Sequence, residues 1–131
     1  ANQRGLHMGG ADARGGHVVL DYIQYSPPVE RDGDWMLQLL RDCVHRAGVR
    51  EVHSHVEQFD GTESPPGFAA VVLIDESHVS AHCYSESGLL AIDIFTCGDS
   101  DPVALADDIH RGVAEAVPRI ELAGRKVLDR F

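Results

Sequence analysis

Residues 68–96 read FAAVVLIDESHVSAHCYSESGLLAIDIFT, and this stretch decides the fold. It holds three runs rich in apolar and β-branched residues, Phe68–Asp75, His78–Tyr84 and Leu89–Thr96. The links between the runs are short and polar. Such links favour antiparallel pairing, because parallel neighbours need a crossover connection of a dozen or more residues. We therefore expect three consecutive antiparallel strands in the middle of the chain.

The flanking segments show strand and helix patterns in turn. The expected elements are strands at His17–Gln24, Glu51–Phe59 and Arg119–Leu128, and helices at Asp34–Ala47 and from Asp101 to about Val117. Asp34 is placed to cap the first helix and Gly48 to end it, while Pro102 suits the first turn of the second helix. Gly124 interrupts the last strand. This order predicts an α+β two-layer sandwich, with a mainly antiparallel sheet and helices on one face.

Length, charge and composition limit the classes of protein. The 131 residues suit one domain at 16–131, preceded by a glycine-rich flexible tail at 1–15. The net charge of −10, without a basic cluster, argues against nucleic-acid binding. No run approaches the roughly 20 apolar residues of a membrane span. We expect a cytoplasmic protein with no nucleic-acid or membrane partner. The three cysteines, Cys43, Cys83 and Cys97, match neither a disulfide framework nor a zinc motif.

Two short segments, Glu76–His82 and Phe95–Gly98, gather the reactive side chains. If the two runs pair as a hairpin, Ser77 and Cys97 come from its opposite ends and can lie close together. His82 has the opposite strand parity from Ser77. On their own these residues leave a hydrolase open, although the chain lacks the GxSxG nucleophile elbow.

Alternating histidines also raise the question of a metal site. His53 and His55 lie on one face of a predicted strand, as do His78 and His82 on another. Solvated or hydrogen-bonded histidines explain the same pattern more simply. We therefore expect no metal.

Two motifs resemble a known family. Val71–His82 closely resembles the self-cleavage segment of the prokaryotic, pyruvoyl-dependent S-adenosylmethionine decarboxylase proenzymes. Ala91–Gly98 resembles the second signature of that family, at the family's spacing. Gly16-His17 followed by Asp21 is similar to its N-terminal strand. The resemblance extends from about Gly16 to the end of the second predicted helix.

The resemblance implies that the chain cuts itself between Glu76 and Ser77. Ser77 would attack the Glu76 carbonyl, and the chain would become a β chain, 1–76, and an α chain, 77–131, that begins with a pyruvoyl group. His82 matches the histidine that acts as acid and base in this processing. The pyruvoyl cofactor would form a Schiff base with the substrate amine and act as electron sink for decarboxylation. Cys97 matches the proton donor.

The same resemblance implies a substrate site and an assembly. Glu86 falls where the family has a glutamate, and it could bind the ribose or the cationic end of the substrate. Tyr84 and Phe59 are candidates to stack on the purine and the sulfonium, since aromatic faces attract cations. A homodimer is expected, because the family builds its pocket at a subunit interface. The product would supply aminopropyl groups for spermidine.

Three positions depart from the family pattern. Ala69 lacks a hydroxyl that assists processing in relatives, Asp75 replaces a small residue beside the cut, and Cys83 replaces a threonine. These departures keep two alternatives open. One is a pyruvoyl-dependent decarboxylase of ornithine or arginine with the same fold, and the other is an unprocessed, non-catalytic paralogue.

Overall fold

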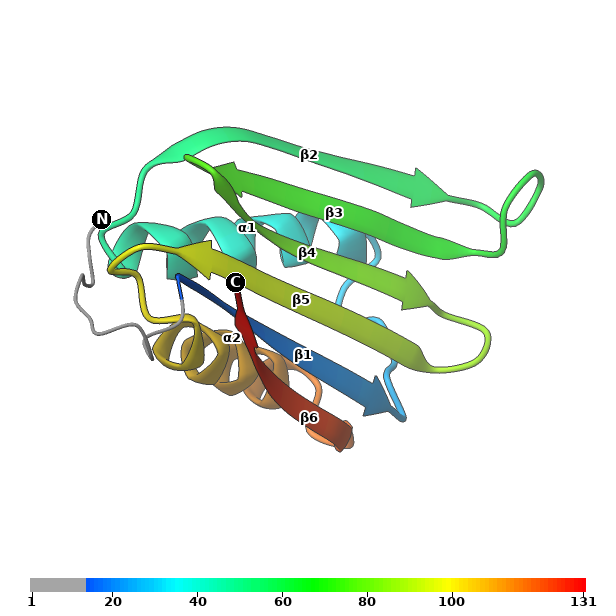
Figure 1. Ribbon diagram of the computed structural model, residues 1–131. Helices are drawn as coiled ribbons and strands as arrows, with labels where there is room; N and C mark the ends of the chain where they lie inside the picture. Colours follow the sequence, from blue (N-terminus) through cyan, green and yellow to red (C-terminus); the bar gives the residue numbers. More distant parts are fainter. Residues whose placement is uncertain (1–13) are drawn as a thin grey trace.

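The computed structural model describes residues 14–131, which form one six-stranded sheet and two helices (Figure 1). The elements are β1 (Gly15–Ile23), α1 (Asp32–Arg46), β2 (Glu51–Phe59), β3 (Gly67–Ile74), β4 (Ser77–Tyr84), β5 (Leu89–Cys97), α2 (Pro102–Ala116) and β6 (Glu121–Arg130). The predicted tail falls mostly on residues 1–13, which lie outside the described part.

The sheet has the strand order β2-β3-β4-β5-β1-β6, and all neighbouring strands are antiparallel. The three central hairpin strands predicted from residues 68–96 are confirmed as β3, β4 and β5. Both helices cover the same face of the sheet, behind the strands in Figure 1. The predicted α+β two-layer sandwich is therefore confirmed.

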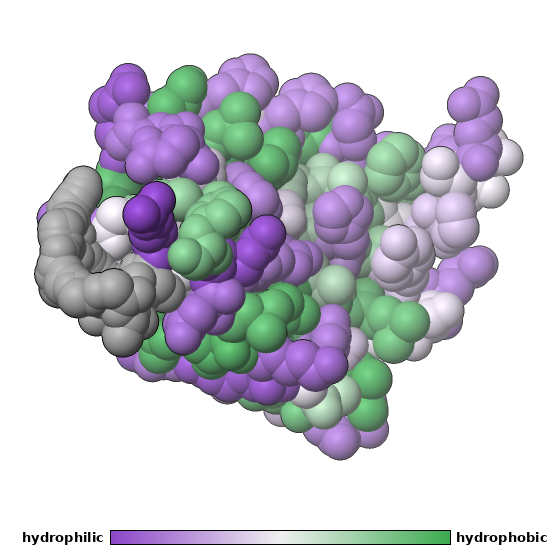
Figure 2. All heavy atoms as spheres, in the orientation of Figure 1, coloured by the Kyte–Doolittle hydropathy of each residue, from purple (hydrophilic) through white to green (hydrophobic). Residues whose placement is uncertain are grey.

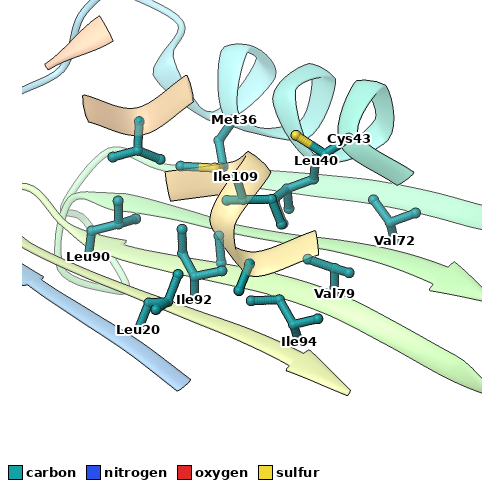
Figure 3. Close-up of a cluster of buried hydrophobic side chains, with 14 of the residues drawn as sticks. Leu20, Met36, Leu40, Cys43, Val72, Val79, Leu90, Ile92, Ile94 and Ile109 are labelled. Carbon is teal, nitrogen blue, oxygen red and sulfur yellow. The ribbon is translucent and has the colours of Figure 1, made fainter. Parts of the chain in front are cut away.

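The core lies between the sheet and the helices (Figure 3). Every second residue of each central strand points into it, so β4 alternates buried Val79, Ala81 and Cys83 with more exposed neighbours. Helix α1 contributes Met36 and Leu40. The other core side chains with no exposed surface are Val18, Leu20, Cys43, Val44, Val72, Ile92, Ile94, Ala106, Ile109 and Val113.

Helix α1 begins at Asp32, so the predicted start at Asp34 was wrong by two residues. The cause is tertiary: the Asp32 carboxylate is buried, where Tyr25 Oη donates to it at 2.7 Å and Gln58 Nε2 at 3.2 Å. Gly48 follows the helix with φ +78°, as a helix-ending glycine should.

Helix α2 confirms the other predicted helix signals. The Asp101 side chain accepts hydrogen bonds from the N–H groups of Val103 and Ala104, and Pro102 occupies the first turn. In β6, the register against β1 shifts between Asp21 and Tyr22, directly beside Gly124. The interruption predicted there is a β-bulge.

The sheet face away from the helices has no covering layer within residues 14–131. Figure 2, in the same orientation as Figure 1, shows hydrophobic and hydrophilic residues interspersed over it. Leu73, Tyr84, Leu89 and Leu128 are each more than 40% exposed, and their strand parity places them on this open face. No helix within the described residues is both long and apolar enough to cross a lipid bilayer.

Candidate active site

Ser77 is the first residue of β4, directly after a two-residue turn. Ile74 and Ser77 pair across the β3–β4 hairpin, which leaves Asp75 and Glu76 to form the turn. Both turn residues are exposed, whereas Ser77 is only 8% exposed. The Glu76–Ser77 peptide bond therefore joins a solvent-exposed turn to a buried side chain.

Cys97 at the end of β5 holds the Ser77 hydroxyl. The Cys97 backbone N–H donates a hydrogen bond to Ser77 Oγ at 3.0 Å. The thiol lies on the β1 side, where Gly15 has no side chain to cover it: a Cβ at Gly15 would lie 3.5 Å from Cys97 Sγ. The proximity predicted for Ser77 and Cys97 is therefore confirmed, and the cysteine is partly exposed.

A polar cluster that sequence reasoning missed lies at the same end of the sheet. His17 Nε2 lies 3.0 Å from Asp93 Oδ1, and Arg130 Nη1 lies 3.4 Å from His17 Nδ1. Because a guanidinium only donates, Nδ1 accepts and Nε2–H donates to the carboxylate. Arg130 also lies 5.3 Å above the Phe95 ring. The cluster depends on β1 pairing with both β5 and β6, which local patterns do not reveal.

His78 follows Ser77 and lies on the open face beside this cluster. Its ring centroid is 5.6 Å from that of Phe95. Burial, and then the nearby His17, lower the pKa of His78, while Asp93 acts in the opposite direction. His78 is therefore mostly a neutral imidazole at neutral pH.

The other predicted site residues lie toward the opposite end of the sheet. His82 is five residues along β4 from Ser77, about 17 Å at the rise of a strand, and Tyr84 is about 24 Å away. Glu86 is in the β4–β5 loop beyond Tyr84, and Phe59 ends β2. One chain thus brings Ser77 and Cys97 together but leaves these four residues apart from them.

Phe59 and Tyr84 flank a glycine on the open face. Phe59 pairs with Gly67, and Gly67 pairs with Tyr84, so the two aromatic residues lie two strands apart, about 10 Å. Gly67 has φ +152°, and a Cβ there would lie 1.9 Å from the Cys83 carbonyl oxygen. Only glycine fits at this position, between the two aromatic residues.

A partly buried hydrogen-bond network supports this end of the sheet. Gln58 donates from Nε2 to the Gly67 carbonyl at 2.9 Å and accepts from the Gly33 N–H at 3.0 Å. The same amide donates to Asp32, which also accepts from Tyr25. The network ties the start of α1 to the ends of β2 and β3, and so fixes the backbone next to Phe59.

Two of the three thiols belong to the core. Burial raises the pKa of Cys43 to about 12 and that of Cys83 to about 12. Both are therefore protonated and unreactive at neutral pH. Within residues 14–131, no group of three or more histidine, cysteine or carboxylate side chains could hold a metal ion, and His55 instead contacts Glu57 at 2.6 Å.

A pocket of about 570 Å³ opens on the helix side at the Ser77 end. The end of α1, the start of α2 and the end of β5 line it, through residues that include Arg46, Asp108 and Thr96. Neither Ser77 nor Cys97 lines this pocket. Of the second motif, Thr96 reaches this pocket, whereas the two residues proposed for catalysis lie outside it.

Comparison with known proteins agrees with this geometry. The family model described as S-adenosylmethionine decarboxylase matches residues 16–125. A relative from Bacillus cereus, named S-adenosylmethionine decarboxylase proenzyme 1, is 37% identical over 115 residues, covering 85% of this chain and 84% of the relative. The proenzyme from Archaeoglobus fulgidus is 34% identical over 92 residues, covering 70% and 79%.

A solved structure shares the fold. The crystal structure of the adenosylmethionine decarboxylase from Aquifex aeolicus VF5 superposes with a TM-score of 0.66 at 28% identity, covering 90% of this chain and 91% of that one. The family match spans both motif segments and every element except the first residue of β1 and the end of β6. The chain therefore belongs to the S-adenosylmethionine decarboxylase family.

Proposed function

We propose that the chain cuts itself between Glu76 and Ser77, forms a pyruvoyl group from Ser77, and decarboxylates S-adenosylmethionine. The observation that carries this proposal is the 3.0 Å hydrogen bond from the Cys97 N–H to Ser77 Oγ, directly after an exposed turn. The bond orients the hydroxyl oxygen without using its proton, so the hydroxyl can still lose that proton on attack.

Self-cleavage proceeds through an ester intermediate and then an elimination. Ser77 Oγ attacks the Glu76 carbonyl carbon, the peptide C–N bond breaks, and the Ser77 nitrogen keeps its hydrogen and gains the hydroxyl proton, which gives an ester and a free amine. Loss of the Ser77 Cα proton then breaks the Cβ–Oγ bond, and Glu76 leaves as a carboxylate. Addition of one water and loss of ammonia convert the remaining enamine into a ketone. His82 serves as the acid and base for these proton transfers.

The residues around Ser77 fit a pyruvoyl group. Ser77 begins a strand, its backbone is held by the β3 ladder, and its side chain lies against the β5 end. The ketone of the pyruvoyl group supplies an electron sink for the bond that loses CO₂. His78, directly after Ser77, is mostly neutral. It therefore adds no positive charge that would stabilise the substrate carboxylate against loss as CO₂.

Cys97 delivers the proton that replaces the lost carboxyl group. Its thiol is partly exposed, and Gly15 leaves it uncovered on the β1 side. Its backbone N–H is bonded to Ser77 Oγ, which holds the end of β5 beside Ser77. This role requires a protonated thiol at the moment of transfer.

We propose that a second copy of the chain completes the site. Four predicted site residues are on the open face or in the loop at its far end: His82, Tyr84, Glu86 and Phe59. Along β4, His82 lies about 17 Å and Tyr84 about 24 Å from Ser77. Stacking two open faces with opposed strand directions brings one copy's far end over the Ser77 end of the other copy, where His78 and Cys97 lie on the open face. The exposed apolar residues of that face, among them Leu73 and Leu89, would then be buried.

In this arrangement the adenine ring binds over Gly67, between the two aromatic side chains. Phe59 and Tyr84 on either side would stack on it, as aromatic rings stack in offset pairs. Glu86 supplies a carboxylate for the ribose hydroxyls or the cationic end of the substrate. The expected product is the aminopropyl donor for spermidine.

Intact mass and CO₂ release test the function together. The 14.3 kDa chain should convert into two pieces divided at Glu76/Ser77, and the cut protein should release CO₂ from S-adenosylmethionine. Cys97→Ala should still cut but should release little CO₂. A chain that stays whole after long incubation contradicts the self-cleavage. A cut chain that releases CO₂ from ornithine or arginine, but none from S-adenosylmethionine, contradicts the substrate.

A further inference from the structure

The turn before Ser77 contains a residue in an unusual backbone conformation. Asp75 has φ +50°, in the left-handed region that side-chain-bearing residues seldom adopt. Aspartate tolerates this region better than most residues, but the conformation still costs energy relative to glycine. The turn that presents the Glu76 carbonyl therefore needs support from elsewhere in the molecule.

Arg50 provides that support through an ion pair. Its Nη2 lies 2.7 Å and its Nε 3.1 Å from Asp75 Oδ1. The arginine is held in place by the next residue, because Glu51 accepts from Arg41 Nε at 2.9 and 3.1 Å and contacts His45 at 3.0 Å. Helix α1, the start of β2 and the cleavage turn are thus joined in one chain of contacts.

The charges at the turn give the ion pair a second effect. Attack by Ser77 places negative charge on the Glu76 carbonyl oxygen, and the completed cut leaves a new carboxylate on Glu76. Asp75 and Glu76 already carry two negative charges at these positions. Like charges this close oppose further negative charge. By neutralising Asp75, Arg50 lowers that opposition.

We propose that Arg50 is a positioning residue for self-cleavage, which acts by holding and neutralising Asp75 in the turn. The inference rests on the self-cleavage proposed above. It also accounts for one departure from the family pattern: Asp75, which replaces a small residue beside the cut, is paired with Arg50. Arg50 touches no reacting atom, so its effect is on the rate of the cut alone.

The test follows the cut by intact mass after rapid purification of the uncut chain. Arg50→Met should slow cleavage about two- to five-fold, the range for an exposed ion pair. Arg50→Lys should recover part of the loss, because lysine keeps the charge but not the two-nitrogen contact. Added salt should slow the wild type toward the rate of Arg50→Met and should change that variant little. The Tm of the uncut forms should stay within a few degrees.

Two further variants make the result specific. Asp75→Asn combined with Arg50→Met removes both charges and keeps a residue that tolerates the left-handed region, so it should cut at least as fast as Arg50→Met alone. Arg31→Met removes a comparable exposed pair, Arg31–Asp34 at 2.6 Å, at the start of α1, and should leave the cleavage rate unchanged.

The outcomes separate the inference from the function on which it rests. A wild-type chain that never cuts contradicts the function. A wild type that cuts, with Arg50→Met cutting equally fast, overturns the inference and leaves the function standing. Equal slowing in Arg31→Met, or additive slowing in the double variant, also overturns the inference. Either result would mean that the cleavage rate depends on the overall charge of the chain and not on the Arg50–Asp75 pair.

Discussion

Replacement of Gly67 by alanine should damage both substrate binding and stability. A Cβ at this position would lie 1.9 Å from the Cys83 carbonyl oxygen, and that oxygen would have to retreat by 1.1 Å to reach even 3.0 Å. The oxygen belongs to β4, whose ladder with β3 fixes the spacing of the strands that carry Tyr84 and Phe59. The substitution therefore widens or distorts the spacing of the two aromatic residues.

The size of the effect follows from two costs. The backbone conformation, with φ +152°, is expected to cost alanine about 1–2 kcal/mol, and forcing the strands apart about 1–3 kcal/mol more. The free energy of unfolding should fall by about 3 kcal/mol, which corresponds to a Tm decrease of roughly 12 °C in a domain of this size. Gly48→Ala is the matched control: φ there is +78°, but nothing lies within 4 Å of the added Cβ. It should cost about 1 kcal/mol.

Thermal unfolding and steady-state kinetics with S-adenosylmethionine measure both effects. Gly67→Ala should raise KM well above the wild-type value, whereas Gly48→Ala should not. The rate of the cut should stay close to wild type in Gly48→Ala, whereas Gly67→Ala should also slow the cut, because it displaces the backbone of Cys83 next to His82. Equal Tm decreases in the two variants would refute the steric argument. A KM unchanged in Gly67→Ala would refute the proposed binding of adenine over Gly67.

Three further predictions concern single side chains. Ala69→Ser should speed the cut, because Ala69 pairs with His82 across β3 and β4 on the open face and a serine hydroxyl there could take part in the proton transfers of His82. Unchanged or slower conversion, followed by intact mass, would contradict this. At pH 8, iodoacetamide should alkylate one thiol of the folded chain, that of Cys97, because the two core thiols stay buried and protonated; after unfolding it should alkylate all three. Two or more alkylated thiols on the folded chain would contradict this prediction. Because the folded state lowers the pKa of His78, the unfolded chain binds a proton there at a higher pH than the folded chain does, and the free energy of unfolding should fall as the pH falls below about 6.5. In urea titrations at several pH values, His78→Gln should make the free energy of unfolding depend less on pH. An unchanged pH dependence would contradict the lowered pKa.

The fold was largely predictable because local patterns dominate it. Strand alternation in residues 68–96, together with short polar links, located β3, β4 and β5 to within a residue or two. The helix caps at Asp101 and Gly48 were also predictable, since each depends on its own backbone neighbours. The start of α1 was not, because Asp32 is held by Tyr25 and Gln58, which are distant contacts that no local pattern records.

The site was predictable only where a hairpin joins its parts. Ser77 and Cys97 meet because β4 and β5 are consecutive antiparallel strands, and that much follows from the sequence. The cluster of His17, Asp93 and Arg130 requires β1 to insert between β5 and β6, a long-range pairing. The catalytic and binding roles of the motif residues remain predictions that the experiments above address.

The strand order has a consequence for the molecule after the cut. Division at Glu76 assigns β1, β2 and β3 to one polypeptide and β4, β5 and β6 to the other. Across the sheet these polypeptides alternate, so the ladders β3–β4, β5–β1 and β1–β6 all become contacts between separate chains. Unfolding then releases two molecules instead of one. The reverse reaction becomes second order, the Tm should rise with protein concentration, and an enzyme that folded as one chain should recover poorly from denaturation once it has been cut.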